Sequence, residues 1–173
     1  MCPHDKKLYE NLLNILPTNS GSIEFLRTFD FKSYHFASDT LNDLERFHYL
    51  WNGVEYNFVD DELNELLNQL KDKTKKFLLN VDMNVYPAEA YGFKKVLREF
   101  NNGERNEEYN KIIEELHNDS GEIIKAREEI IKLFIEKDND NKITSDKECT
   151  FKQAITYFIK DLYSATPCQD SIS

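Results

Sequence analysis

Glycine and proline are scarce in this chain, which has 5 Gly and 4 Pro among its 173 residues. An all-β domain needs many tight turns, and turns rely heavily on these two residues. Their scarcity therefore argues against a turn-rich β fold. The sequence also lacks any run near the roughly 18 apolar residues of a membrane-spanning helix. We therefore expect no membrane span.

Cysteine is rare as well, and its pattern is uninformative for disulfides or zinc. Cys2, Cys149 and Cys168 are odd in number and widely spaced, and no Cys-x-x-Cys occurs. This usage is typical of a reducing compartment. No apolar stretch of signal-peptide length follows the first residues, so the expected location is cytoplasmic.

Basic side chains are outnumbered, with 22 Lys and Arg against 32 Asp and Glu, giving a formal net charge of −10. Binding nucleic-acid phosphates requires a cationic surface, so a direct nucleic-acid ligand is disfavoured. A basic protein partner is favoured, because opposite charges accelerate association. The alternative is that the charge serves only solubility.

The chain is rich in large apolar side chains, including 12 Phe, 9 Tyr and one Trp. Their spacing of three and four residues is helical over most of the chain. Two Ser/Asp-x-x-Glu patterns, starting at Asp119 and Ser145, resemble capping boxes and predict helix starts. The expected helices cover approximately residues 4–16, 22–28, 39–51, 62–79, 88–100, 104–117, 120–135 and 145–163.

The predicted fold is all-α: a single compact bundle of about seven or eight helices over residues 1–163, with room for one short extended segment. Residues 164–173 are expected to form a frayed tail. The inward positions of the strongest helical stripes define the predicted core: Trp51, Leu63, Leu67, Leu70, Phe77, Ile131, Phe134, Phe158 and Ile159.

One segment resembles a stretch found in uncharacterised bacterial helical proteins. It covers residues 23–86 and includes Phe25-Leu-Arg27, Phe29-Asp-Phe31, Trp51 and Phe58-Val-Asp-Asp-Glu-Leu63. The resemblance implies a helical fold. It implies no activity.

Residues 136–148 resemble a degenerate EF-hand loop, in which oxygen ligands alternate before a hydrophobic residue. Asn141 stands where glycine is usual, and Lys147 stands where a bidentate Glu closes the loop. The candidate ligands for weak calcium binding are Glu136, Asp138, Asp140, Lys142 through its carbonyl, and Thr144. The competing interpretation is a polar connection between two helices. No other cofactor is expected.

Acidic residues are concentrated in residues 39–65, which hold 8 acidic side chains and one basic side chain, Arg46. Such a block can form a docking surface for a basic partner, or simply a solvated helix face. The candidate partner-binding residues are Asp39, Asp43, Glu45, Glu55, Asp60, Asp61, Glu62 and Glu65.

Three functional hypotheses remain open at this point. The leading one is protein–protein binding in a regulatory, inhibitor or immunity-like role. The second is a divalent-ion-responsive module that uses residues 136–148. The third is an enzyme whose site is assembled from scattered residues. This third hypothesis is disfavoured because the sequence has no Gly-rich phosphate loop, Gly-x-Ser-x-Gly or paired-histidine metal motif.

Overall fold

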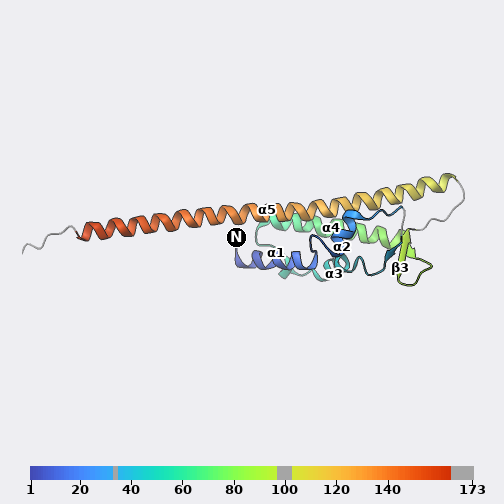
Figure 1. Cartoon of the computed structure of the whole chain (residues 1–173), viewed down its shortest axis with the longest axis horizontal. Coiled ribbons are helices and arrows are strands. Elements are labelled where there is room, and N and C mark those ends of the chain that lie inside the picture. Colours follow the sequence, from blue (N-terminus) through green and yellow to red (C-terminus); the bar gives the residue numbers. More distant parts are fainter. Residues whose placement is uncertain (33–34, 97–102, 165–173) are drawn as a thin grey trace, which may run out of the picture. The chain divides into compact units, whose positions relative to one another are not determined.

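A computed structural model describes residues 1–32, 35–96 and 103–164, with side chains described as far as residue 140 except at 103–106. The chain divides into two units, Met1–Phe134 and Ile135–Ser173, and each is treated by itself. Figure 1 shows the elements in chain order: α1 (Pro3–Ile15), α2 (Gly21–Thr28), β1 (Phe36–Ala37), α3 (Asn42–Leu50), the 3-10 turn η1 (Val54–Tyr56), α4 (Asp61–Asn84), β2 (Val85–Pro87), β3 (Phe93–Val96) and α5 (Gly103–Ser164).

The expectation of an all-α bundle with seven or eight helices is wrong. The described residues form five α-helices and a three-stranded antiparallel sheet in the order β1-β3-β2. The observed fold differs from the expected one in two places. A segment expected to be a helix forms a β-hairpin instead, and three expected helices form a single one.

The hairpin of β2 and β3 replaces the helix expected over residues 88–100. Val85 pairs with Val96 and Tyr86 with Lys95, while Gly92 takes a positive φ of 81° in the connection. Pro87 at the end of β2 and the left-handed Gly92 both oppose helix continuation. Aromatic and β-branched residues occur in strands as well as in helices, so the hydrogen-bonded pairing with β2 and β1 selects the strand conformation for β3. Residues 97–100 of the expected helix lie outside the described residues.

The described residues of the aromatic segment from Phe29 to Phe36 include core side chains and the start of a short strand. Phe36 begins β1 and faces Lys94 of β3. Phe31 and Phe36 are buried, and Phe25, Phe29, Phe31 and Phe36 form a cluster of ring contacts. Such edge-to-face and stacked pairs add to the burial energy.

Helix α5 passes through both predicted capping boxes without ending. Its residues up to Phe134 belong to the first unit. There, Asp119 and Ser120 use their side chains elsewhere. The Asp119 carboxylate accepts from Lys76 and Asn80 of α4, and the Ser120 hydroxyl donates to the Leu116 carbonyl of its own helix. Neither side chain is therefore available to cap a new helix at residue 119.

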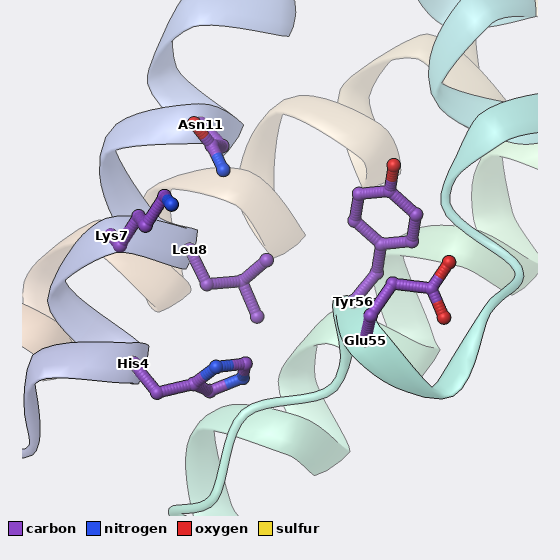
Figure 2. A pocket seen from close by; sticks show the side chains of 6 residues that line it. All are labelled: His4, Lys7, Leu8, Asn11, Glu55 and Tyr56. Carbon is purple, nitrogen blue, oxygen red and sulfur yellow. The ribbon is translucent and has the colours of Figure 1, made fainter.

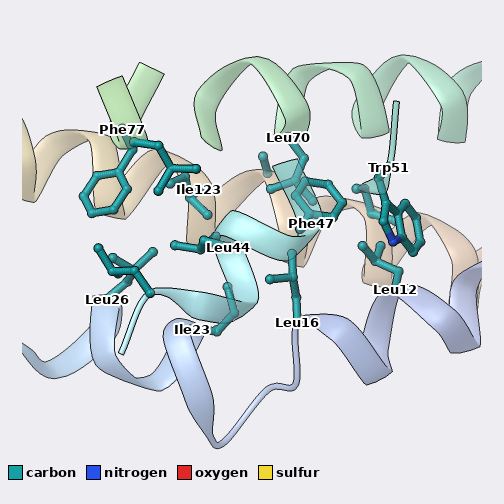
Figure 3. Packing of buried hydrophobic residues seen from close by; sticks show 14 of the residues in the cluster. Leu12, Leu16, Ile23, Leu26, Leu44, Phe47, Trp51, Leu70, Phe77 and Ile123 are labelled. Carbon is teal, nitrogen blue, oxygen red and sulfur yellow. The ribbon is translucent and has the colours of Figure 1, made fainter. Parts of the chain in front are cut away.

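The core of the first unit gathers side chains from all five helices, as Figure 3 shows. Trp51, Leu63, Leu67, Leu70, Phe77 and Phe134 are buried as predicted, whereas Ile131 is only half-buried. Trp51 lies between Phe47 and Tyr56, at ring-centroid distances of 5.4 and 5.2 Å. Phe158 and Ile159 lie outside the described side chains.

Candidate functional site

Two of the eight predicted partner-binding residues cap helices of the first unit. The Asp43 carboxylate accepts from the Ser22 backbone N–H at 3.2 Å, at the start of α2. Gly21 there has a positive φ of 62°, and a Cβ at this position would collide with Asp43 Oδ2. Asp60 accepts from the Leu63 backbone N–H at 3.1 Å and so begins α4. Both carboxylates therefore serve the fold by satisfying free N–H groups.

A third carboxylate, which the sequence did not single out, supports the start of α4. Asp5 of α1 is buried and accepts from the backbone N–H groups of Val59 and Asp60 at 2.8 and 3.2 Å. A buried carboxylate with two backbone donors is well compensated for its lost hydration. Asp5 thereby ties α1 to the segment that precedes α4.

The remaining residues of the predicted acidic surface do not gather into one site. Asp39, Asp61, Glu62 and Glu65 are exposed, with Asp61 and Glu62 in the first turn of α4, where negative charge complements the helix dipole. Glu45 and Glu55 are placed differently, because each lines a pocket.

The first pocket lies between α1 and η1 and holds about 230 Å³ (Figure 2). His4, Lys7, Leu8 and Asn11 of α1 line one side, and Glu55 and Tyr56 line the other. His4 Nε2 donates to the Asn57 carbonyl at 2.9 Å, so this nitrogen is occupied. The Glu55 carboxylate points away from α1 in Figure 2 and lies over Gly53. The pocket is thus lined mainly by polar side chains, and the Glu55 carboxylate does not point toward α1.

The second pocket, here called the α3–α4 groove, also holds about 230 Å³. Its lining residues come from α3 and α4: Glu45, His48, Tyr49, Lys75, Leu78, Leu79 and Asp82. Two large apolar side chains at this groove are exposed, Tyr49 by 73% and Leu79 by 52%. Glu45 and Asp82 contribute a carboxylate from each helix. Lys75 of α4 also lines the groove, so the groove combines exposed apolar surface with two carboxylates and one ammonium group, a small excess of negative charge.

Both pockets are small for a metabolite. Small-molecule sites usually enclose roughly 300–1,000 Å³ and bury most of the ligand. A volume of about 230 Å³ is closer to that of a single side chain or two. Pockets of this size at a protein surface suit the anchor side chains of a protein partner.

The candidate calcium ligands lie in α5 rather than in a loop. Glu136, Asp138 and Asp140 are four residues apart from first to last, so on a helix Glu136 and Asp140 share a face and Asp138 does not. The side chains of Lys142 and Thr144 lie outside the described residues. Within the described part of the chain, no three His, Cys, Asp or Glu side chains gather as a metal site. Ion binding at 136–148 stays a prediction.

Of the residues that line the α3–α4 groove, the sequence singled out Glu45; those it did not indicate include Tyr49, Leu79 and Asp82. Tyr49 and Leu79 fall just outside the apolar stripes of their helices, and a large apolar residue off the stripe was the available signal. Asp82 lies in residues 80–87, where the helical pattern was expected to have ended, but α4 continues to Asn84. Their convergence depends on the packing of α3 against α4, which the sequence does not reveal.

Comparison with known proteins adds no relative. No protein-family model matches the chain, and neither the curated proteins nor the solved structures contain a match. Among the helices of the described residues, none is both long and apolar enough to cross a membrane.

Proposed function

We propose that this protein acts by binding another protein through the α3–α4 groove. The observation that carries the proposal is the pair of exposed apolar side chains, Tyr49 and Leu79, at a pocket of side-chain size. Tyrosine is enriched among the residues that dominate interface energies, and such residues pair with pockets on the partner. Exposed apolar side chains that border a pocket therefore favour a contact surface.

The partner's contacting segment is proposed to carry an apolar side chain flanked by Lys or Arg. The apolar group would enter between Tyr49 and Leu79. The cationic groups would approach Glu45 and Asp82 on the two sides of the groove. The overall charge of −10 favours the same partner, because long-range attraction raises the association rate.

The exposed acidic residues in the N-terminal part of α4, together with Asp39, are assigned a secondary role. Charges at the edge of an interface affect mainly the association rate and its salt dependence. Asp61, Glu62, Glu65 and Asp39 fit that role by their exposure. Asp43 and Asp60 do not, because they cap helices. A regulatory, inhibitor or immunity-like task in the cytoplasm would suit a binding protein of this kind, without catalysis of its own.

The experiment begins with affinity purification of the full chain from its host, followed by binding measurements with the purified partner. The groove variant is Tyr49→Ala with Leu79→Ala. Both side chains are exposed, so the fold should tolerate their loss. The matched control is Tyr91→Ala, which removes a fully exposed tyrosine from the β2–β3 connection. We expect the groove variant to bind at least about tenfold more weakly, which equals about 1.4 kcal/mol.

A second variant, Glu45→Lys with Asp82→Lys, tests the charge of the partner. A basic partner should lose affinity and associate more slowly, whereas an acidic partner should gain. Equal affinity for the wild type, the groove variant and the Tyr91→Ala control would overturn the proposed groove. Faster association of the charge-reversed variant would keep the groove and reject a basic partner.

A further inference from the structure

The connection between α1 and α2 receives two arginine side chains from different helices. Arg127 of α5 donates from Nε to the Leu16 carbonyl at 2.8 Å and from Nη2 to the Thr18 hydroxyl at 2.9 Å. Arg27 of α2 donates from Nη1 to the Thr18 carbonyl at 3.2 Å. Two guanidinium groups thus meet at one residue, Thr18, which is itself exposed.

Arg127 is unusual because it is buried without a carboxylate partner. Its exposure is 1%, and its Nη1 has no hydrogen-bond partner among the described residues. Burial lowers the pKa of this guanidinium and outweighs the opposing effect of Tyr9, while the charge of Arg27 lowers the pKa further and that of Glu128 opposes it. Buried charges are normally paired, and a buried donor without an acceptor costs free energy. The site therefore has spare positive charge and a spare donor.

Arg27 is differently placed. Its side chain is about one-third exposed and forms ion pairs with Glu128 at 3.1 Å and Glu24 at 3.5 Å. Exposed pairs of this kind contribute little to stability and are readily exchanged. A stronger anion at Thr18 could therefore recruit Arg27 without a large loss elsewhere.

We propose that Thr18 is a phosphorylation site whose phosphoryl group is held by Arg127 and Arg27. The geometry supports this, since the Thr18 hydroxyl oxygen already accepts from Nη2, which neighbours the unpartnered Nη1 on the same guanidinium. Phosphoryl oxygens added at that position bring acceptors to the end of the guanidinium, where arginine binds phosphate through two parallel hydrogen bonds. Thr18 itself is exposed, and a kinase that phosphorylates it must displace the hydrogen bond from Arg127 Nη2 to reach the hydroxyl. This inference is independent of the α3–α4 groove.

Phosphorylation of Thr18 requires a nucleoside triphosphate as phosphoryl donor and a protein kinase as catalyst. The Thr18 oxygen forms a bond to the γ-phosphorus, and the bond from that phosphorus to the nucleoside diphosphate breaks. The hydroxyl proton passes to a base of the kinase. The modified side chain carries a charge of about −1.5 to −2 at neutral pH and three acceptor oxygens.

The test compares the full chain carrying phosphothreonine at position 18 with the full chain carrying phosphoserine at position 20. Ser20 is an exposed residue of the same connection whose side chain makes no capping hydrogen bond. Phosphorus NMR follows the second ionisation of each phosphate against pH. We expect the Thr18 phosphate to lose its second proton about tenfold more readily than the Ser20 phosphate, because arginines favour the dianion.

Two additions separate the causes. Arg27→Gln should reduce, in part, the difference in second ionisation between the Thr18 and Ser20 phosphates. Arg27 is exposed enough for the variant to fold. Titration of the unmodified chain with inorganic phosphate tests the other source of the same anion. Equal ionisation of the two phosphates would overturn the proposal. Inorganic phosphate alone could produce saturable changes in the NMR chemical shifts of Thr18 while the Thr18 and Ser20 phosphates ionise equally. In that case the site would bind a free anion, and the covalent modification would be rejected.

Discussion

Helix α4 and the part of α5 up to Phe134 line the same core, yet they relate to their sequences in opposite ways. Helix α4 begins directly after Asp60, one residue before the start expected from the sequence. In α5, the predicted helix start at Asp119 lies inside the helix and begins no new one. The difference lies in what each carboxylate contacts. Asp60 accepts from a backbone N–H three residues on, and Asp119 accepts from Lys76 and Asn80 of another helix.

This contrast shows that a capping sequence specifies only an available side chain. A helix ends where the chain gains more from a cap than from further intrahelical hydrogen bonds. At Asp60, the buried Asp5 also accepts from the backbone immediately before the helix, which fixes the turn. At Asp119, the partners on α4 outcompete local capping.

The largest effect should come from the shared core. Leu70→Ala in α4 and Ile123→Ala in α5 remove fully buried side chains, and each should lower the free energy of unfolding by about 2–5 kcal/mol. Leu79→Ala in α4 is the matched control, since the side chain is about half exposed. It should cost less than about 1 kcal/mol. Denaturant unfolding measures all three, and similar losses at Leu70 and Leu79 would contradict the described packing of α4.

The continuity of α5 is tested at Gly121. If the helix continues through this position, Gly121→Pro removes an interior hydrogen bond and should cost about 3 kcal/mol. Gly121→Ala should instead stabilise by about 0.5–1 kcal/mol, because the position is exposed and an added Cβ meets no atom within 4 Å. A helix that began at residue 120 would tolerate proline in its first turn. Thermal unfolding of the two variants therefore distinguishes one helix from two.

The cap of α4 provides the next test. Asp60→Ala removes the acceptor for the Leu63 N–H and should cost about 0.5–2 kcal/mol. Asp61→Ala, one residue on, removes only a favourable charge near the helix dipole and should cost about 0.3–1 kcal/mol. Denaturant unfolding at constant salt compares them. A larger loss at Asp61 than at Asp60 would contradict the assigned cap.

The smallest effect concerns the pair of Lys76 and Asp119, whose Nζ and Oδ1 atoms are 2.7 Å apart. The hydrogen bond to Asp119 and its charge raise the pKa of Lys76 above the ordinary 10.5. The folded state thus holds this proton longer than the unfolded state. The stabilisation is fully present below pH 10.5 and is lost as the pH rises through the raised folded value.

The wild type and Lys76→Gln should therefore differ in stability below pH 10.5, and the difference should disappear only as the pH rises through the raised pKa of folded Lys76. The effect is small because the Lys76 side chain is 68% exposed. Lys75→Gln is the control, since this neighbouring lysine has no ion pair with the described residues. A difference that did not change with pH would show that the pair is not the cause.

Much of the helical content could be predicted from sequence because apolar spacing is a local property. The stripe of Leu63, Leu67 and Leu70 identified α4 and its buried face correctly. The prediction of a helix over residues 88–100 was wrong for the opposite reason, since Phe93 and Val96 fit both a helix and a strand. The pairing of β3 with its hairpin partner β2, and with β1 from a distant part of the chain, selected the strand.

The candidate site was predictable only in part. Acidic composition identified Glu45, but it also selected Asp60, which caps its own helix locally, and Asp43, whose capping role depends on a neighbour in space. Asp43 contacts Ser22, which is 21 residues earlier in the chain. The cluster at Thr18 is more distant still, since Arg127 lies 109 residues beyond it. No local pattern indicates that such residues meet.

The chain contains one tryptophan, and its position gives the molecule a built-in optical reporter. Trp51 is buried between Phe47 and Tyr56 in the first unit. An indole shielded from water emits at shorter wavelengths than a hydrated one, so the emission maximum should move to longer wavelengths when the surrounding packing is lost. Because the second unit contains no tryptophan, fluorescence would report the unfolding of Met1–Phe134 alone, and circular dichroism would report the helices of both units.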